Sequence, residues 1–257
     1  MVDWDGERYA EVRGLQRMVA EEAITGLALA GDERLLDVGC GDGFITMLLA
    51  ERLPDGSVVG VDASHRMIER ALARVPFDML RVQFHVDEVL ALPFDHDFDI
   101  VVSFNALHWV HDQGEALRQI GRSLVGGGRA VLQMVCATER PSIEDVAMQV
   151  ATDSRWAPAF DGFRAPYVHV EPAHFGHLAE AAGFTVDDLT VKDLSWQFDS
   201  VDDFRDWFAV GASDWTSRLP DTEIDAFVAA VVDRYQSAVG EPALFRFGQL
   251  RASLRVP

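Results

Sequence analysis

The chain has 257 residues, of which 49% are hydrophobic and 25% charged, so it can bury a sizeable core and is not expected to be disordered. Its 42 Asp and Glu residues outnumber its 22 Lys and Arg residues, which gives a formal net charge of -20. A surface of this charge repels a phosphate backbone, so a nucleic-acid substrate is not expected.

The cysteines and the N-terminal stretch indicate where such a protein works. Cys40 and Cys136 lie far apart in the sequence, which is typical of reduced thiols rather than of a disulfide framework. The opening stretch MVDWDGERYAEV is acidic and has no apolar run, so neither a signal peptide nor a membrane span is predicted there. We therefore expect a cytoplasmic protein.

The first half of the chain alternates between helix and strand patterns. Apolar residues at helical spacing predict a helix within residues 7–30, which ends at Gly31. Strands are then predicted at 34–38, 57–61, 81–86, 98–104 and 129–136, and helices at 44–53, 64–75 and 113–125. This alternation predicts an α/β fold, a Rossmann-like, doubly wound parallel sheet with helices on both faces.

The alternation stops after Cys136. Residues 139–172 hold several prolines and aromatic residues around a helical piece near 143–154. Further helices are predicted at 173–182, 201–209 and 221–239, and strands at 184–194 and 243–256. We expect one sheet domain of residues 1–138 and 172–257, with mostly helical cap insertions at 139–171 and about 195–240.

A glycine-rich loop follows the first predicted strand, in the stretch LLDVGCGDGF that ends at Phe44. Gly39, Gly41 and Gly43 alternate between a strand and a helix, which lets backbone N–H groups approach a ligand at a helix N-terminus. A nucleotide-like ligand is indicated, although a tight turn without a ligand has the same pattern. The NAD fingerprint G-x-G-x-x-G is absent, which disfavours a nicotinamide cofactor.

Three acidic residues lie at or near the ends of successive predicted strands. Asp37 precedes the glycine loop, where a carboxylate could meet an amino group of the ligand. Asp62 ends the second strand, where a carboxylate can bridge two ribose hydroxyls. Asp87 ends the third strand, where it could face the exocyclic amine of an adenine ring. Together they form one candidate site for a nucleoside-containing ligand.

The motifs LLDVGCGDG, VVGVDAS, FHVDE and FDIVVSFNALHWV resemble, in order and spacing, those of class I S-adenosylmethionine-dependent methyltransferases over roughly residues 34–136. The resemblance implies a seven-stranded sheet with an antiparallel last strand, and S-adenosylmethionine as the cofactor, with S-adenosylhomocysteine as product. Residues 1–138 and 172–257 would then be the methyltransferase domain. The implied cofactor-binding residues are Asp37, Gly39, Cys40, Gly41, Asp62, Ala63, Met67, Asp87, Glu88, Phe104 and Asn105.

Each of these residues has an implied role. Gly39, Cys40 and Gly41 would line the methionine part of the cofactor, with Asp37 behind the loop near its amino group. Asp62 would bind the ribose. Ala63 and Met67 would pack on the adenine, while Asp87 and Glu88 would face its amine and ring edge. Phe104 and Asn105 would form the pocket wall near the cofactor.

A finer resemblance is to the trans-aconitate and juvenile hormone acid methyltransferase group, which methylates small-molecule carboxylates. It depends on the N-terminal DWDGERY, on Tyr9 followed by Gln16 in the first helix, and on NALHWV after the fourth strand. It implies that Tyr9, Gln16 and Trp109 bind the substrate, with Gln16 and Trp109 holding its carboxylate. Relatives that act on hydroxyl groups or quinone-like rings share the Asn and Trp positions.

The expected chemistry is an SN2 displacement at a sulfonium methyl, in which positioning supplies much of the rate. A carboxylate, with a pKa near ~4, is already ionised and needs no general base. A hydroxyl or ring carbon needs one, and His108 or His111 is then the candidate. A metal site at these two histidines is not expected, because no third ligand is evident.

Aromatic residues gather beyond the glycine-loop half, at Phe204, Trp207, Phe208 and Trp215. They form either an apolar lid over an organic substrate or the core of the cap. The negative surface opposes a highly anionic substrate such as a tricarboxylate, which favours a monocarboxylate with an apolar body. A hydroxyl, phenol or ring-carbon methyltransferase, a nicotinamide-dependent oxidoreductase and a cofactor-binding protein without catalysis remain open alternatives.

Overall fold

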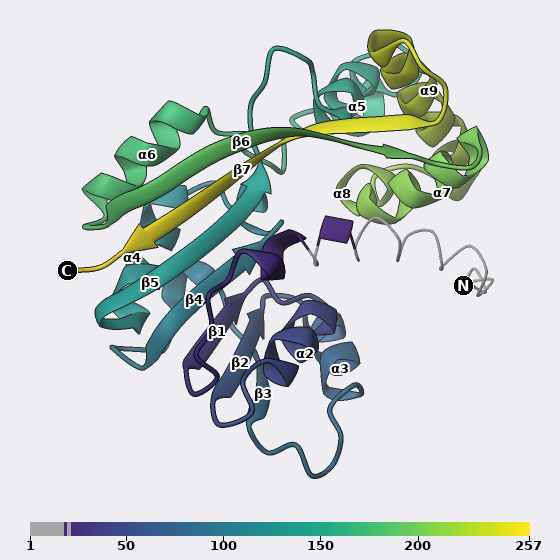
Figure 1. The fold of residues 1–257 in the computed structure, drawn as a ribbon. Coiled ribbons are helices and arrows are strands. Elements are labelled where there is room, and N and C mark those ends of the chain that lie inside the picture. The colour runs from purple at the N-terminus through teal and green to yellow at the C-terminus, as the bar shows by residue number, and fades with distance from the viewer. Residues whose placement is uncertain (1–17, 20–21) are drawn as a thin grey trace. The chain divides into compact units, whose positions relative to one another are not determined.

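The computed structural model describes residues 18–19 and 22–257, which Figure 1 draws as a coloured ribbon. Tyr9 and Gln16, predicted to bind the substrate, lie outside the described residues. Their roles stay predictions.

The described chain forms two compact units. The sheet unit contains residues 22–136, 168–192 and 249–257, and the helical unit contains residues 18–19, 137–167 and 193–248. The chain therefore passes between the units several times. Two of these passages fall within single strands, at residues 192–193 and 248–249.

Seven strands form one mixed sheet, in the order β3-β2-β1-β4-β5-β7-β6. Their bounds are β1 (Arg34–Val38), β2 (Ser57–Asp62), β3 (Val82–Val86), β4 (Phe98–Phe104), β5 (Leu124–Val135), β6 (Thr185–Gln197) and β7 (Leu244–Arg255). Strands β1 to β5 pair in parallel, and β7 pairs antiparallel with β5. The predicted seven-stranded sheet with an antiparallel last strand is confirmed.

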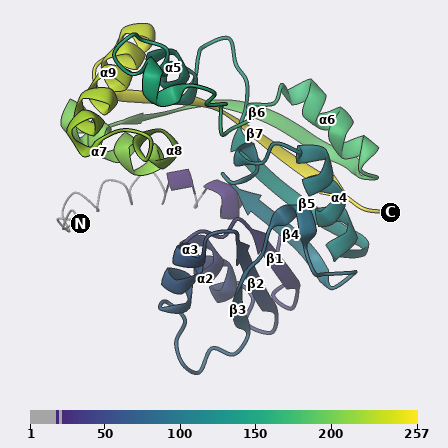
Figure 2. The same cartoon turned by 180° about the vertical axis from the view of Figure 1, so that it is seen from behind.

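Helices of the sheet unit cover both faces of the parallel strands, as Figures 1 and 2 show from opposite sides. On one face, α2 (Phe44–Glu51) and α3 (His65–Leu72) pack on Val102 and its neighbours. On the other, α4 (Gln113–Ser123) and α6 (Pro172–Ala181) pack on Leu132 and its neighbours. Helices on both faces confirm the doubly wound arrangement. Fully burying a large aliphatic side chain between a helix and the sheet contributes about 1.5–3 kcal/mol to stability.

Local sequence signals fix where these helices begin. Ser64 caps α3, because its hydroxyl accepts a hydrogen bond from the Met67 N–H at 3.4 Å. Asp112 caps α4 in the same way, accepting from the Glu115 N–H at 2.8 Å. Between the larger elements lie the short 3-10 helices η1 (Val89–Ala91) and η2 (Leu107–Trp109), which the periodicity did not predict.

Several predicted boundaries were wrong by a few residues, and contacts with distant residues explain two of them. The helix expected over 113–125 ends at Ser123, and Leu124 begins β5, so the glycines at 126–128, which lay between the predicted helix and strand, belong to the strand. Leu124 pairs with Phe98, and the register then shifts before Ile100, an irregularity that glycines accommodate without steric cost.

The second wrong boundary is that of the first helix, expected within 7–30, whose described helical residues end at Thr25. The guanidinium of Arg251 donates to the carbonyls of Glu22 and Ala23, each at 3.0 Å. These carbonyls therefore need no further helical turn to be satisfied, so the helix can stop there.

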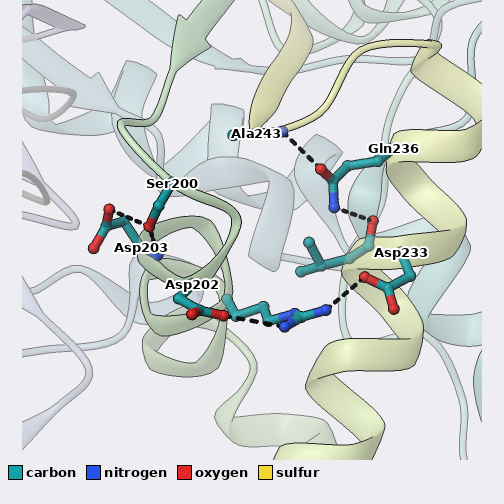
Figure 3. Close-up of polar contacts among 8 residues, drawn as sticks. Ser200, Asp202, Asp203, Asp233, Gln236 and Ala243 are labelled. Carbon is teal, nitrogen blue, oxygen red and sulfur yellow. Dashed lines mark hydrogen bonds and ion pairs between the residues drawn. The ribbon is translucent and has the colours of Figure 1, made fainter.

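The helical unit contains α5 (Ile143–Ala151), η3 (Ala157–Phe160), α7 (Val201–Gly211), α8 (Ser213–Thr216) and α9 (Asp221–Val239). Arg205 on α7 links two helices, donating to Asp202 at 3.1 Å and to Asp233 on α9 at 2.8 Å. Figure 3 shows this bridge beside the N-cap of α7 and the Gln236 side chain, which accepts from the Ala243 N–H at 2.6 Å. Polar contacts thus fix α7 against α9.

The aromatic residues named above pack inside the helical unit. Phe204 and Trp215 are fully buried, and the ring of Phe204 stacks on Phe198 with centroids 4.9 Å apart. Trp207, only partly buried, lies 4.6 Å from the ring of Phe245. These side chains form the core of this unit. That the unit also covers a substrate stays a prediction.

Among the described residues, no helix combines the length and the apolar character that crossing a membrane requires.

Candidate cofactor and acceptor site

The candidate site lies at the carboxyl ends of the parallel strands, where the strand order reverses between β1 and β4. Open α/β sheets bind ligands at such a switch point, because neighbouring loops diverge there. The glycine loop follows β1, Asp62 ends β2, Asp87 follows β3 and Asn105 follows β4. The fold therefore brings the sequence-predicted cofactor residues to one edge of the sheet.

The glycine loop has a backbone that only glycine adopts easily. Gly39, Gly41 and Gly43 have φ values of 73°, 55° and 76°, all in the left-handed region. The Gly39 and Cys40 N–H groups donate to the Val61 carbonyl at 2.8 and 3.0 Å, which fixes the loop on β2. A Cβ built on Gly41 would meet nothing within 4 Å, so open space lies beside that residue.

The Asp62 carboxylate is held from both sides. Its Oδ2 accepts from the Gly41 N–H at 3.0 Å, and its Oδ1 accepts from the Ser64 N–H at 2.9 Å. Each oxygen keeps a lone pair for a further donor. The Asp87 N–H donates to the Asp62 carbonyl at 3.2 Å, which brings the two acidic residues side by side. A ligand with two adjacent hydroxyls could therefore bind a carboxylate that is already oriented.

The remaining residues of this edge vary in exposure. Asp87 and Met67 are partly buried, and Ala63 and Glu88 are exposed. Ala63 directly precedes the N-cap of α3, and Met67 lies in its first turn. A flat apolar ring could lie against them, which is the placement that the sequence predicts for adenine.

Asp37 lies behind the loop and is buried, with 2% of its surface exposed. Burial, with a smaller contribution from the nearby charge of Asp62, raises the pKa of its carboxyl to about 7, against the opposing effect of the hydrogen bond from Thr46 Oγ1 at 2.6 Å. Burial and the charges of Asp37 and Asp62 also raise the pKa of the Cys40 thiol, which keeps it protonated and unreactive.

The segment after β4 lies against the glycine loop. A Cβ built on Gly39 would lie 2.2 Å from the Cβ of Ala106, so the two backbones are in close contact. Asn105 has a left-handed φ of 57°, and its N–H donates to the Gln133 carbonyl at 2.7 Å. Its buried Oδ1 has no hydrogen-bond partner among the described residues. A strained backbone and an orphaned polar atom are typical of a ligand site.

The two histidines of this segment differ sharply. His108 is 4% exposed, and burial lowers the pKa of its imidazole to about 3, with a smaller effect from the charge of His169. His111 is exposed. Trp109, between them, is 36% exposed, and its ring lies 5.1 Å from that of His108. The segment thus presents an indole at the surface of the sheet unit over a neutral, buried imidazole.

The comparisons with known proteins agree with this geometry. Residues 35–128 match a family described as a methyltransferase domain. The chain is 31% identical over 186 residues to the trans-aconitate 2-methyltransferase of Rhodococcus jostii, covering 72% of this chain and 70% of that protein. It is 30% identical over 158 residues to that of Variovorax paradoxus, covering 61% of this chain and 59% of that protein. The match thus spans about three fifths of the Variovorax protein.

This chain belongs to the class I S-adenosylmethionine-dependent methyltransferases of the trans-aconitate type.

Solved structures agree on the fold of this methyltransferase. A crystal structure from Bacillus halodurans with a provisional methyltransferase assignment superposes with a TM-score of 0.67 at 20% identity. The superposition covers 93% of this chain and 98% of that one.

The residues on this edge are compatible with S-adenosylmethionine. The open space beside Gly41 leaves room for a ligand where a side chain would otherwise lie, and the oriented Asp62 carboxylate suits the two ribose hydroxyls. Asn105 Oδ1 adds an acceptor without a partner among the described residues. The cofactor supplies a methyl group on a positively charged sulfur, which makes the methyl carbon electrophilic.

Sequence reasoning missed three glutamines near this edge. Gln113 donates from Nε2 to the carbonyls of Leu107 at 3.2 Å and Val168 at 3.1 Å, which fixes the η2 turn that carries Trp109. Gln133 on β5 and Gln249 on β7 are 0% and 2% exposed. The three glutamines differ from surface glutamines only in being buried, and no local sequence motif predicts that burial.

Proposed function

We propose that this methyltransferase transfers a methyl group to a carboxylate oxygen of a small organic acid with an apolar body. The observation that carries the proposal is the buried His108, which lies in the segment after β4 with a pKa lowered to about 3. A base whose pKa lies about four units below neutral pH is a poor acceptor for a hydroxyl proton. A carboxylate needs no such acceptor, because it is already ionised.

The names of the curated relatives support the same class of acceptor. Trans-aconitate 2-methyltransferases, by their name, act on an organic acid. Trans-aconitate itself carries several negative charges, and the net charge of -20 on this chain opposes its approach. We therefore favour an acid with fewer charges. The acceptor is the finer part of the proposal, and family membership supports only the methyl transfer.

The cofactor roles are proposed residue by residue. Asp62 binds the ribose hydroxyls, and Gly39, Cys40 and Gly41 line the methionine part with Asp37 behind them. Ala63 and Met67 pack on the adenine, Asp87 and Glu88 face its amine, and Phe104 and Asn105 close the pocket. The contacts that support these roles are the Asp62 hydrogen bonds and the open side of Gly41.

The acceptor is held beside the segment after β4. The indole N–H of Trp109 can only donate, which suits an anionic oxygen. Tyr9 and Gln16 remain proposed partners of the same carboxylate. In the transfer, a carboxylate oxygen forms a bond to the methyl carbon, the carbon–sulfur bond breaks, and its electron pair stays on sulfur. No proton moves, so the chain needs only to position the two reactants.

The cofactor part is tested by Asp62→Asn. Each hydrogen bond to a charged group contributes about 1.5–3 kcal/mol, so we expect S-adenosylmethionine affinity to fall by at least tenfold in isothermal titration. Asp99→Asn is the matched control, because Asp99 pairs with Arg34 at 3.2 Å in the same unit, at the opposite ends of β1 and β4. Unchanged affinity in Asp62→Asn contradicts the assignment of this site.

The acceptor part is tested by a methyl-transfer screen with tritiated S-adenosylmethionine. The acids are dodecanoate, citronellate, phenylacetate and trans-aconitate, and the matched alcohols and phenol are dodecanol, citronellol and phenol. We expect turnover of acids alone, retained in His108→Gln and His111→Ala. Turnover of alcohols or phenol alone, lost in either histidine variant, overturns the carboxylate in favour of a base-dependent reaction. Cofactor binding without turnover of any compound contradicts the proposed catalysis.

A further inference from the structure

Two buried glutamine side chains on neighbouring strands have polar atoms without partners. Gln133 on β5 is 0% exposed, and neither Nε2 nor Oε1 has a hydrogen-bond partner among the described residues. Gln249 on β7 is 2% exposed, and its Nε2 likewise has no partner there. Buried amides are nearly always hydrogen-bonded, because leaving one unpaired costs stability. Such a pair calls for an additional binding partner.

The strand register places both amides on one face of the sheet. Gln133 pairs with Arg251, and Val135 pairs with Gln249, in the antiparallel ladder of β5 and β7. Directly paired residues share a face, and so do residues two apart, so Gln133 and Gln249 are diagonal neighbours on the same face. Diagonal neighbours lie roughly 7–8 Å apart, which is within reach of a shared small ligand.

This face is the one that carries the glycine loop. Phe104 pairs with Gln133 across β4 and β5, and it packs in the same apolar cluster as Cys40. The Gln133 carbonyl accepts the Asn105 N–H at 2.7 Å, and the next residue, Ala106, lies against Gly39. Gln133 is therefore only one strand removed from the close contact between the glycine loop and the segment after β4.

The pair lies on the side of the loop away from the residues proposed to hold the nucleoside. Asp62 ends β2 and Asp87 follows β3, on one side of β1, whereas β5 and β7 lie beyond β4 on the other. A ligand group near Gln133 and Gln249 would thus belong to the methyl acceptor and not to the adenosine part of the cofactor.

The chemistry of the pair suits an anionic oxygen. Amide N–H2 groups donate hydrogen bonds without carrying a full positive charge. Arg251, which pairs directly with Gln133, directs its guanidinium to the carbonyls of Glu22 and Ala23 at 3.0 Å each. Neutral donors orient a carboxylate while leaving more of its charge for attack than an ion pair with arginine would.

We propose that the side-chain amides of Gln133 and Gln249 bind the acceptor carboxylate through its non-reacting oxygen and so select acids over alcohols. This inference rests on the proposed function. The two amides would add hydrogen-bond donors for the carboxylate to the indole N–H expected from Trp109. They come from sheet residues that belong to no recognised motif.

The test is Gln133→Leu and Gln249→Leu, each assayed with the acids that the wild-type methylates. We expect KM for the acid to rise about tenfold or more in each variant, since a hydrogen bond to a charged group is lost. The affinity for S-adenosylmethionine stays unchanged, and the midpoint of thermal unfolding stays equal or rises, because an unpaired buried amide is removed. A purely structural role for the glutamines would instead lower the midpoint and leave KM unchanged.

The matched control is Ser103→Ala. The Ser103 hydroxyl is also fully buried and also has no partner among the described residues, but Ser103 pairs with Leu132, whose side chain lies on the opposite face of the sheet. KM in this variant should match the wild-type. KM values within twofold of the wild-type in both glutamine variants overturn the inference while acid turnover stands. If the wild-type methylates no acid, the proposed function fails first, and this inference fails with it.

Discussion

Polar side chains on the two sides of β1 and β4 differ in whether their hydrogen bonds are already made. On the side of β2 and β3, the Asp62 carboxylate accepts two backbone N–H groups, and Asp37 accepts the Thr46 hydroxyl. On the side of β5 and β7, His108 Nδ1 and atoms of both buried glutamines have no partner among the described residues. The cofactor side is built before a ligand arrives, and the acceptor side has polar atoms that a ligand or water would satisfy.

This difference has an energetic consequence. Groups whose hydrogen bonds are already made hold their geometry without a ligand, so binding there costs little reorganisation. Unpaired buried groups lower the stability of the protein, and a ligand that satisfies them recovers that cost. We therefore expect substitutions on the cofactor side to lower stability and cofactor affinity together. On the acceptor side, we expect substitutions to separate stability from acceptor binding.

The largest expected effect comes from Gly39→Ala. The new Cβ would lie 2.2 Å from the Ala106 Cβ, and the φ of 73° is strained for alanine. Overpacking and left-handed strain together cost about 2–5 kcal/mol, which lowers the midpoint of thermal unfolding by roughly 5–15 °C. We also expect S-adenosylmethionine binding to be lost in isothermal titration.

Gly127→Ala is the control for that variant. Gly127 has nearly the same φ, 77°, but its Cβ would meet nothing within 4 Å. This change imposes the strain without the collision, so it should cost only about 1–2 kcal/mol and leave cofactor affinity intact. Equal destabilisation in the two variants would show that the contact between the loop and Ala106 is loose.

The next effect is on the pH dependence of folding stability, to which Asp37 and His108 contribute with opposite signs. The pKa of Asp37 is raised to about 7 in the folded state, so between its unfolded pKa near ~4 and pH 7 the native state holds the extra proton. Its contribution to stability therefore falls as the pH rises through that window. The pKa of His108 is lowered to about 3, so between pH 3 and about 6.5 the unfolded state holds the extra proton. Its contribution rises with pH.

Single variants should expose each slope. In His108→Gln only the pH dependence due to Asp37 remains, so the free energy of unfolding should rise, relative to wild-type, as the pH falls from 6.5 to 4.5. In Asp37→Asn the His108 slope remains, and the free energy should fall over the same range. Each slope approaches about 1 kcal/mol per pH unit, because one proton is linked to folding. Urea unfolding at pH 4.5, 5.5 and 6.5 measures both, and parallel curves in the two variants contradict the assignments.

The same contrast explains what the sequence could predict. The glycine loop and Asp62 belong to short local motifs, and glycine's backbone freedom and the strand ends determine their geometry. Gln133 and Gln249 are neighbours only because β5 and β7, which lie far apart in the chain, pair in one particular antiparallel register. A buried glutamine also has no distinguishing local pattern. Local signals therefore predicted the cofactor residues and Trp109, whereas the proposed role of the two glutamines follows only from the fold.

The wrong helix end at 113–125 has a related cause. Leu124 and Val125 continue the helical spacing of apolar residues, but Leu124 pairs with Phe98 in the sheet. Pairing with a distant strand outweighs local periodicity, because the sheet buries Leu124 completely. Local patterns predict where an element lies more reliably than where tertiary contacts end it.

The smallest expected effect is that of Trp109→Phe. Phenylalanine keeps an aromatic ring at this 36% exposed position and removes only the indole N–H. A partly exposed hydrogen bond to an anion is weaker than a buried one, so we expect KM for the acid to rise about two- to fivefold, with kcat and cofactor affinity unchanged. Trp196→Phe, a partly exposed tryptophan of the helical unit, is the control and should leave KM unchanged. An unchanged KM in Trp109→Phe would assign the carboxylate to the glutamine amides and leave Trp109 a packing role, because the indole N–H is the group through which it can donate to an anion.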